Sequence, residues 1–224
     1  MARVASRAVL WDLDGTLVDS EQDHWLAWRD TMAAENVPLT FAQFRATFGW
    51  RNDAILRHWL GDDVAAVRMA RIGDAKEELY RQLVRTGGLA PLPGAAEWVR
   101  RLDGEGWAQA VAASAPRLNI EVVMEAIGLA EMFQATVSAE DVERGKPDPQ
   151  VFLAAAARVG VPPECSIVVE DAAAGIQAAV RAGMRSIAVG RNTDGWPADI
   201  HTPSLADLPV DSFDRLLPER GSVG

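Results

Sequence analysis

Apolar side chains recur every three or four residues between residues 19 and 90, and no convincing strand interrupts that spacing. Trp25, Trp28 and Met32 share one face of a segment from residue 20 to residue 36, which predicts an amphipathic helix. Further helices are predicted to open at Thr40 and at Asn52 and to span residues 64–85. Residues 19–90 are therefore expected to form a helical bundle whose aromatic side chains make its core.

Polar residues ahead of these helices predict how the helices begin. Ser20 with Asp23, and Thr40 with Gln43, have the spacing of a capping box, in which the two side chains bond backbone N–H groups at the start of the helix. Asn52 is expected to cap the third helix with its side-chain oxygen. The bundle is thus predicted to contain several short helices with defined starts.

From residue 94 onward, short apolar runs alternate with amphipathic segments. The runs predict strands over 108–113, 135–138, 166–169 and 185–189, and the segments predict helices over 95–102, 117–127, 149–159 and 173–182. Such alternation is typical of a parallel sheet with helices on both faces, and the run Ala8-Val9-Leu10 supplies a first strand. We therefore predict an α/β fold: a Rossmann-like core of residues 1–18 and 91–224, with residues 19–90 inserted as an α-helical cap.

Composition narrows the class of protein. The chain has 224 residues, 49% of them hydrophobic, and a formal net charge of −10, so no basic field favours a nucleic-acid partner. No apolar run approaches the roughly 18 residues of a membrane span, and the first residues lack the apolar stretch of a secretory signal. Cys165 is the only cysteine, which suits a reducing cytoplasm. We expect a cytoplasmic protein, monomeric or weakly dimeric, without a membrane or nucleic-acid partner.

Two acids follow the first predicted strand at once. Asp12 and Asp14 stand two positions apart, so a strand would direct both side chains to the same side, and Gly15 with Thr16 opens a turn behind them. Two close carboxylates repel each other unless a cation lies between them. The alternative interpretation is an ordinary turn with solvated acids, since Asp and Gly are common turn residues.

Reactive side chains also follow the other predicted strands. Ser114 comes directly after the second strand, Lys146 lies beyond the third, and Glu170 with Asp171 follows the fourth. In an open α/β sheet these strand ends meet at the edge where ligands bind. Hard oxygen ligands suit Mg²⁺, which in proteins usually takes one or two carboxylates together with waters and a substrate phosphate. The alternative for Glu170 and Asp171 is capping of the helix that follows.

Lysine is rare in this chain. Of its 22 basic residues only Lys76 and Lys146 are lysines. Lysine is a compact point charge, whereas arginine is a planar fork, so the two are not interchangeable at a reaction centre. We interpret Lys146, within Gly145-Lys146-Pro147-Asp148-Pro149, as a functional residue, and Lys76 as a surface residue kept by chance.

Four segments resemble, in the same order, the four motifs of the haloacid dehalogenase superfamily. They are Asp12-x-Asp14-Gly-Thr, the serine after the second strand, Gly145-Lys146-Pro-Asp-Pro and Glu170-Asp171-x-x-x-Gly175. The helical insertion after the first motif resembles the branch that holds β-phosphoglucomutase, phosphoglycolate phosphatase and sugar-phosphate phosphatases. The resemblance extends over residues 9–189, and the combination of motifs is far more specific than any one of them.

The resemblance implies a covalent mechanism. Asp12 would attack phosphorus to form an aspartyl-phosphate, and Asp14 would act first as general acid and then as general base. Mg²⁺ would be held by Asp12, by the backbone carbonyl of Asp14 and by Asp171, with Glu170 as a ligand or directly behind the ligands.

The resemblance also assigns phosphate-binding residues. Lys146 and Ser114 would bind phosphoryl oxygens, while Thr16 would bind phosphate or support the loop. The chain departs from the family at its second motif, because a serine is common where Ala113 stands, and Ser114 comes one residue later. Either Ser114 takes over with a small shift, or phosphate binding relies more on backbone N–H groups.

In the cap, His24, Gly49 and Arg51 are candidate substrate-binding residues. The mutase branch carries a lysine before the cap glycine, where this chain has Phe48, whereas Arg51 remains available to contact phosphate. A Mg²⁺-dependent phosphatase acting on small phosphorylated metabolites, sugar or polyol phosphates above all, is therefore the predicted function. β-Phosphoglucomutase is the main alternative. A 2-haloacid dehalogenase has no need of Asp14, and a non-catalytic protein on the same fold has no need of intact motifs.

Overall fold

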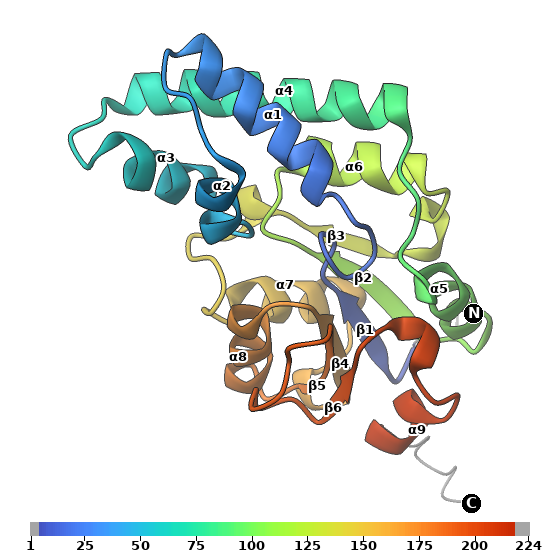
Figure 1. Ribbon diagram of the computed structural model, residues 1–224. Helices are drawn as coiled ribbons and strands as arrows, with labels where there is room; N and C mark the ends of the chain where they lie inside the picture. The colour runs from blue at the N-terminus through green and yellow to red at the C-terminus, as the bar shows by residue number, and fades with distance from the viewer. Residues whose placement is uncertain (1–4, 218–224) are drawn as a thin grey trace, which may run out of the picture.

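Six parallel strands form one sheet in the order β3-β2-β1-β4-β5-β6 (Figure 1). The structure is a computed structural model, and it describes residues 5–217. The strands are β1 (Ala8–Trp11), β2 (Ala108–Ala112), β3 (Ala135–Val137), β4 (Ser166–Glu170), β5 (Arg185–Val189) and β6 (Ile200–Thr202). The chain moves outward from β1 in one direction and then returns to its other side at β4, so the switch in strand order lies at β1, where open sheets place ligands.

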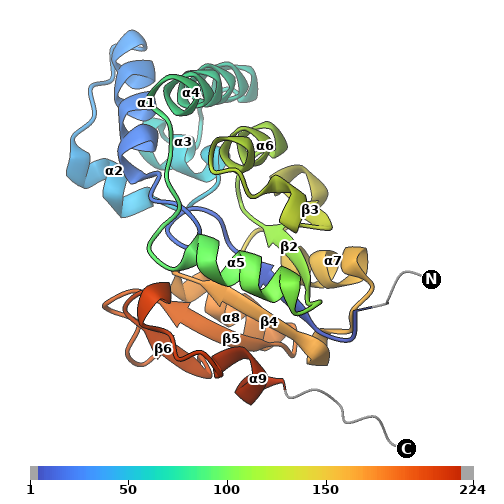
Figure 2. The same cartoon turned by 90° about the vertical axis from the view of Figure 1, so that its right-hand side faces the viewer.

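Helices cover both faces of this sheet (Figure 2). One face packs against α7 (Gln150–Val159) and α8 (Ala173–Arg181). The other face packs against α5 (Ala95–Gly104), α6 (Arg117–Ala126) and α9 (Ser212–Leu216). This arrangement confirms the predicted α/β fold class.

The sequence of β1 explains the two-sided packing. Val9 and Trp11 face the core beneath α5, whereas Ala8 and Leu10 face the core beneath α7. All four side chains are fully buried, because the strand is covered on both faces and side chains alternate between them. The strand therefore carries a continuous apolar run, and the first polar residue, Asp12, marks its exit from the core.

The helices α1 (Glu21–Ala34), α2 (Phe41–Thr47), α3 (Asn52–Leu60) and α4 (Ala66–Gly87) lie together above one edge of the sheet (Figure 1), and we call them the cap. They share a separate apolar core that includes Trp28, Phe44 and Ile72. The chain leaves the core and returns at one place, where Leu92 N–H donates to Leu17 O at 2.8 Å. The predicted limits of the cap, residues 19 and 90, remain a prediction.

Only one of the predicted helix starts has the predicted cap. Thr40 and Gln43 form the full capping box. Ser20 does stand at the start of α1, but its hydroxyl donates to the Asp14 carboxylate and makes no cap hydrogen bond. Asn52 is the first residue of α3, behind Arg51, and its amide donates to a carboxylate on α4. Both side chains are oriented by donation to a carboxylate, and neither accepts from a backbone N–H at the helix start.

Two elements near the end of the chain lie outside the predictions. β6 has three residues at the sheet edge, and α9 has five. Segments this short show too few periods for a pattern to indicate them. The described residues also form the 3₁₀ turns η1 (Ala130–Met132), η2 (Ala139–Asp141), η3 (Pro163–Cys165) and η4 (Leu205–Asp207).

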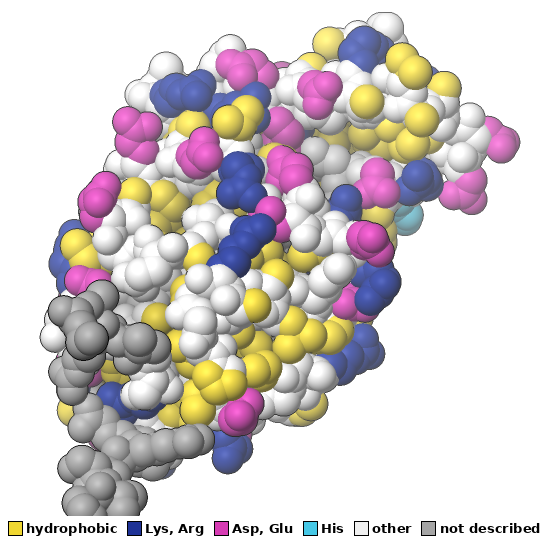
Figure 3. All heavy atoms as spheres, turned by 180° about the vertical axis from the view of Figure 1, so that it is seen from behind, with side chains coloured by type: hydrophobic (Ala, Val, Ile, Leu, Met, Phe, Trp, Pro, Cys, Tyr) yellow, Lys and Arg dark blue, Asp and Glu magenta, His cyan; other side chains and the backbone are white. Residues whose placement is uncertain are grey.

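Acidic and basic side chains are interspersed on the face seen in Figure 3. Within residues 5–217, each helix is too short or too polar to cross a membrane. The predicted absence of a nucleic-acid partner remains a prediction.

Candidate active site

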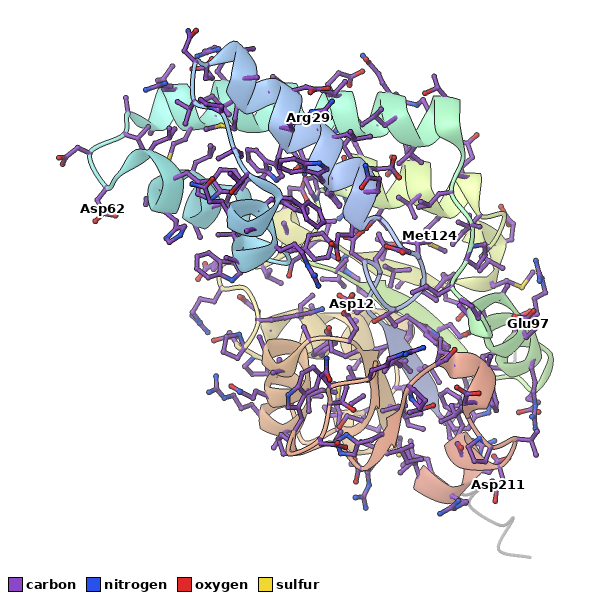
Figure 4. The ribbon with its side chains drawn as sticks, in the orientation of Figure 1. Asp12, Arg29, Asp62, Glu97, Met124 and Asp211 are labelled. Carbon is purple, nitrogen blue, oxygen red and sulfur yellow. The ribbon has the colours of Figure 1, made fainter. Side chains whose placement is uncertain are left out.

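Asp12 lies where the sheet meets the cap (Figure 4). Its N–H donates to Val169 O at 3.0 Å, so the pairing of β1 with β4 continues to this residue and fixes its backbone. The side chain is buried, and Lys146 Nζ donates to Asp12 Oδ1 at 2.5 Å. The same ammonium donates to Glu170 Oε2 at 2.7 Å. The structure thus brings together the ends of β1 and β4 and the loop that follows β3, as the sequence predicted.

Three carboxylates gather at this point. One oxygen from each of Asp12, Glu170 and Asp171 lies within 4.8 Å of the others. Two glycines make room for them: a Cβ at Gly15 would lie 2.0 Å from Asp171 Oδ2, and a Cβ at Gly175 would lie 1.9 Å from Glu170 Oε2. The glycines of the first and fourth motifs are therefore required by the close approach of their backbones to the acids.

Burial and mutual repulsion disfavour ionisation of this cluster. Burial and the charge of Glu170 raise the pKa of the Asp12 carboxyl to about 8 despite the nearby ammonium. Burial and the same neighbour raise the pKa of Asp171 well above its usual value. Although burial opposes it, the charges of Asp12 and Glu170 raise the pKa of Lys146, which therefore stays protonated. A divalent cation would stabilise the ionised forms of these acids, and their hard oxygen atoms suit such an ion.

Glu170 holds the backbone that leads into α8. Its Oε1 accepts from the backbone N–H groups of Asp171 and Ala172, at 3.2 and 3.0 Å, ahead of the helix. Its other oxygen accepts from Lys146. No side chain caps α8, so capping of this helix, the alternative interpretation of Glu170 and Asp171, is wrong.

Asp14 faces the cap rather than the acidic cluster. Its Oδ1 accepts from the Ser20 hydroxyl and lies 3.5 Å from His24 Nε2. The other ring nitrogen of His24, Nδ1, lies 2.9 Å from Lys76 Nζ. An ammonium only donates, so Nδ1 accepts and the Nε2–H is directed toward Asp14. Burial works against ionisation of Asp14, but the hydrogen bonds from His24 and Ser20 hold its pKa below the usual value.

Lys76 is buried in the cap, so its interpretation as a surface residue is wrong. Its side chain is 3% exposed and its Nζ donates to Glu77 Oε1 at 2.9 Å as well as to His24. His24 is held from its other side by Tyr80, whose ring stacks on the imidazole at a centroid distance of 3.9 Å. The rarity of lysine, which drew attention to Lys146, was equally a signal for Lys76.

The predicted phosphate-binding residues occupy different places. Lys146 is at the centre of the site, and Ser114 is half-buried in the lining of the cavity between cap and core. Thr16 is fully buried outside that lining, and its hydroxyl has no partner in the described part of the chain. The structure therefore does not bring Thr16 to the phosphate side of the site, and loop support is the role that its position allows.

All three candidate cap residues line this cavity, whose volume is about 930 Å³. His24 reaches it from α1, and Gly49 and Arg51 reach it from the loop between α2 and α3. Gly49 has a positive φ of 85°, which favours glycine. Phe48 and Trp50 add aromatic surface to the same wall.

A polar network in the wall of the cavity lies outside the sequence predictions. Glu77 on α4 accepts from Lys76, Asn52 and Asn119, the last of these on α6 in the core. Nothing in the spacing of these residues indicates the network, because its members are up to 67 positions apart, from residue 52 to residue 119.

Three features together define a class of hydrolase. They are a parallel sheet with acids at the ends of β1 and β4, a lysine in the loop after β3, and a helical cap. A family model described as haloacid dehalogenase-like hydrolase matches residues 6–183. The chain belongs to the haloacid dehalogenase-like hydrolase family, which confirms the resemblance and the prediction of an enzyme.

Relatives within the family include phosphatases and mutases. Hexitol phosphatase A of Escherichia coli is 32% identical over 223 residues, covering 94% of this chain and 93% of that protein. β-Phosphoglucomutase of Bacillus subtilis is 29% identical over 215 residues, covering 92% of each. The crystal structure of CbbY from Rhodobacter sphaeroides in complex with phosphate superposes with a TM-score of 0.84 at 28% identity, covering 93% of this chain and 99% of that one.

Proposed function

We propose that this protein is a Mg²⁺-dependent phosphatase that hydrolyses small phosphorylated sugars or polyols through an aspartyl-phosphate on Asp12. The observation that carries the proposal is the buried Asp12 carboxylate, with Lys146 Nζ 2.5 Å away and two further carboxylates within the same 4.8 Å cluster. A nucleophile, a cation for the phosphoryl oxygens and a set of metal ligands thus meet at one point. The identity to hexitol phosphatase A supports the substrate class.

Mg²⁺ fits the acidic cluster on the chemistry of its donors. Three carboxylates with one ammonium carry excess negative charge, which a divalent cation removes. Asp12, Asp171 and the backbone carbonyl of Asp14 would hold the ion, with Glu170 as a ligand or directly behind the ligands. When bound, the ion supplies positive charge beside the phosphoryl oxygens.

The two steps use the residues in fixed order. In the first step an Asp12 oxygen bonds to phosphorus, the ester P–O bond breaks, and the departing oxygen takes a proton from Asp14. In the second step a water oxygen bonds to phosphorus, Asp14 takes a proton from that water, and the bond between phosphorus and Asp12 breaks. An alcohol and inorganic phosphate leave, and both acids regain their starting protonation states.

The surroundings of Asp14 suit both proton transfers. His24 and Ser20 hold the pKa of Asp14 below its usual value against the effect of burial, and the resulting carboxylate is the form that a base needs. A phosphoryl dianion arriving beside Asp14 raises that pKa again, because like charges disfavour ionisation. The proton-bearing form that a general acid needs is thereby favoured when substrate is present.

Phe48 favours a phosphatase over a mutase. A mutase must hold the second phosphate of a bisphosphate while the intermediate turns round, and it must keep water away meanwhile. An apolar ring at residue 48 offers a desolvated phosphate no compensation. The 29% identity to β-phosphoglucomutase keeps the mutase as the second candidate.

The proposal is tested by assaying phosphate release from a panel of sugar and polyol phosphates, with and without Mg²⁺. Release with at least one member supports it, and no release from any member contradicts it. The mutase is tested by ³¹P NMR of β-glucose 1-phosphate with a trace of the 1,6-bisphosphate. Accumulating inorganic phosphate supports hydrolysis, whereas clean conversion to glucose 6-phosphate makes the protein a mutase. The cytoplasmic location and the monomeric or weakly dimeric state remain predictions.

A further inference from the structure

Arg51 enters the site from the cap and lies against the loop that carries Lys146. A Cβ built on Gly145 would meet Arg51 Cδ at 3.3 Å, so the glycine lets the arginine side chain pass close to the loop backbone. Asp53, which lies 3.6 Å from Arg51 Nε, belongs to α3, the cap helix that begins directly after Arg51. The guanidinium therefore extends from the cap toward the core.

The Nη1 nitrogen of Arg51 is buried and has no hydrogen-bond partner in the part of the chain that the structure describes. Leaving a buried donor of a charged group unpaired is costly, and native structures rarely do so without a functional reason. A guanidinium bonds carboxylate and phosphate oxygens especially well. The position therefore calls for an anionic acceptor that arrives with a ligand.

The place toward which Arg51 extends is the second motif. A space of about 10 Å³, about the size of one water molecule, is lined by Arg51, Ala113, Ser114 and Lys146 among others. The resemblance to the family implies a phosphate-binding hydroxyl at residue 113, and this chain has a methyl group there. The Ala113 N–H is also unavailable, because it donates to Val137 O at 3.0 Å. Residue 113 therefore supplies no donor, and the Ser114 hydroxyl and Arg51 are the groups that line the same space.

The balance of charges at the site indicates that a further positive charge is needed beside the phosphoryl group. The carboxylates of Asp12, Glu170 and Asp171 carry three negative charges, and Lys146 with a bound Mg²⁺ carries three positive ones. A phosphoryl dianion arriving there meets no net positive charge. A second fixed cation beside the phosphoryl oxygens would stabilise the charge of the transition state.

We propose that Arg51 is a catalytic residue, whose Nη1 donates to a non-bridging oxygen of the phosphoryl group being transferred. Resting on the proposed function, this makes Arg51 the replacement for the hydroxyl that Ala113 lacks. Because the arginine belongs to the cap, the site is complete only with the cap seated on the core. Because every substrate carries the phosphoryl group, replacing Arg51 should lower kcat whatever the leaving group.

The leaving group separates this role from simple substrate recognition. We compare Arg51→Ala and Arg51→Lys with the wild type on phenyl phosphate, which has no second anion or hydroxyl, and on the best sugar phosphate. We expect kcat of Arg51→Ala to fall at least 100-fold on both substrates, and Arg51→Lys to recover only part of the loss. A loss limited to KM for the sugar phosphate would overturn the proposal, because Arg51 would then bind the leaving group.

Arg57→Ala is the matched control. Arg57 lies on α3, which Arg51 precedes. It is exposed and pairs with Asp53 at 2.9 Å, but it does not line the cavity. We expect its kcat to stay within twofold of the wild type on phenyl phosphate. A fall as large as that of Arg51→Ala would overturn the proposal, because the loss would then follow any change of charge on α3.

A second measurement needs no turnover. We titrate the protein with inorganic phosphate in the presence of Mg²⁺ and follow the heat of binding. Arg51→Ala should bind phosphate at least tenfold more weakly, and Arg57→Ala should bind it as the wild type does. Unchanged affinity in Arg51→Ala would overturn the proposal. If the wild type hydrolyses no ester at all, the proposed function fails while this titration still tests Arg51.

Restoring the hydroxyl gives the sharpest test. The space beside residue 113 leaves room for the Ala113→Ser oxygen. We expect Ala113→Ser to raise kcat of Arg51→Ala at least tenfold and to change kcat of the wild type less than threefold, with unchanged melting temperatures confirming the fold of both. If Ala113→Ser changed kcat by the same factor in the wild type and in Arg51→Ala, the proposal that Arg51 replaces the hydroxyl would be overturned.

Discussion

Glu77 on α4 accepts a hydrogen bond of 2.5 Å from Asn119 Nδ2 on α6, and this contact joins the cap to the core. The other oxygen of the same carboxylate accepts from Asn52 Nδ2 at 2.6 Å and from Lys76 Nζ at 2.9 Å. Asn119 Oδ1 in turn accepts from Arg81 at 3.0 Å. One buried carboxylate therefore holds two cap helices, one core helix and the lysine that orients His24.

Removing that carboxylate should destabilise the protein strongly. Glu77→Ala leaves the Lys76 ammonium buried without its charge partner, which costs about 3–5 kcal/mol of unfolding free energy. The neighbouring Glu78→Ala is the control, because Glu78 is exposed and pairs with Arg81 in solvent, so its loss should change the free energy of unfolding far less. Urea unfolding followed by tryptophan fluorescence measures both, and equal losses would contradict the role of Glu77.

Asp12→Asn should abolish turnover without unfolding the protein. The amide keeps the shape of the side chain but cannot attack phosphorus, so kcat should fall by more than 10²-fold, which is at least about 2.7 kcal/mol of activation free energy. The far-ultraviolet circular dichroism should match that of the wild type. A variant that keeps more than about 1% of wild-type kcat would exclude a covalent aspartyl-phosphate.

The pH dependence of stability should change with Mg²⁺. Burial and Glu170 raise the pKa of Asp12 to about 8 from an ordinary value of 3.8, so the folded protein without metal binds a proton that the unfolded chain releases. The contribution of Asp12 to the free energy of unfolding is fully present below pH 3.8 and is lost as the pH rises toward 8. With chelator, the melting temperature of the wild type should therefore fall relative to Asp12→Asn across this range, and saturating Mg²⁺ should remove the fall. Parallel curves for the two proteins in chelator would contradict the raised pKa.

Lys146→Arg should not preserve activity. A guanidinium is too wide to occupy the place where one ammonium donates to both Asp12 and Glu170, at 2.5 and 2.7 Å. We expect kcat to fall at least 100-fold. Arg144→Lys in the same loop is the control, because the Arg144 side chain is exposed and pairs with Asp148, and its kcat should stay within twofold. Near-wild-type kinetics for Lys146→Arg would mean that Lys146 has no specific role in catalysis.

The sequence by itself determined the sheet and the position of the reactive acids. The uninterrupted apolar run of Ala8–Trp11 requires burial on both faces, and Asp12 marks its end. The parallel strands that follow place their carboxyl ends at one edge, so Asp12, Lys146 and Glu170 had to meet there. Local order and period were sufficient for this part of the site.

Only the tertiary structure decided the partners of the buried polar groups. Ser20 and Asn52 were expected to cap helices, yet their side chains bind Asp14 and Glu77 instead. Lys76 was expected at the surface and lies beside His24. A buried polar group bonds the strongest acceptor within reach, and reach is set by how the cap packs on the core. That distance in space does not follow from spacing along the chain, so no sequence pattern contained it.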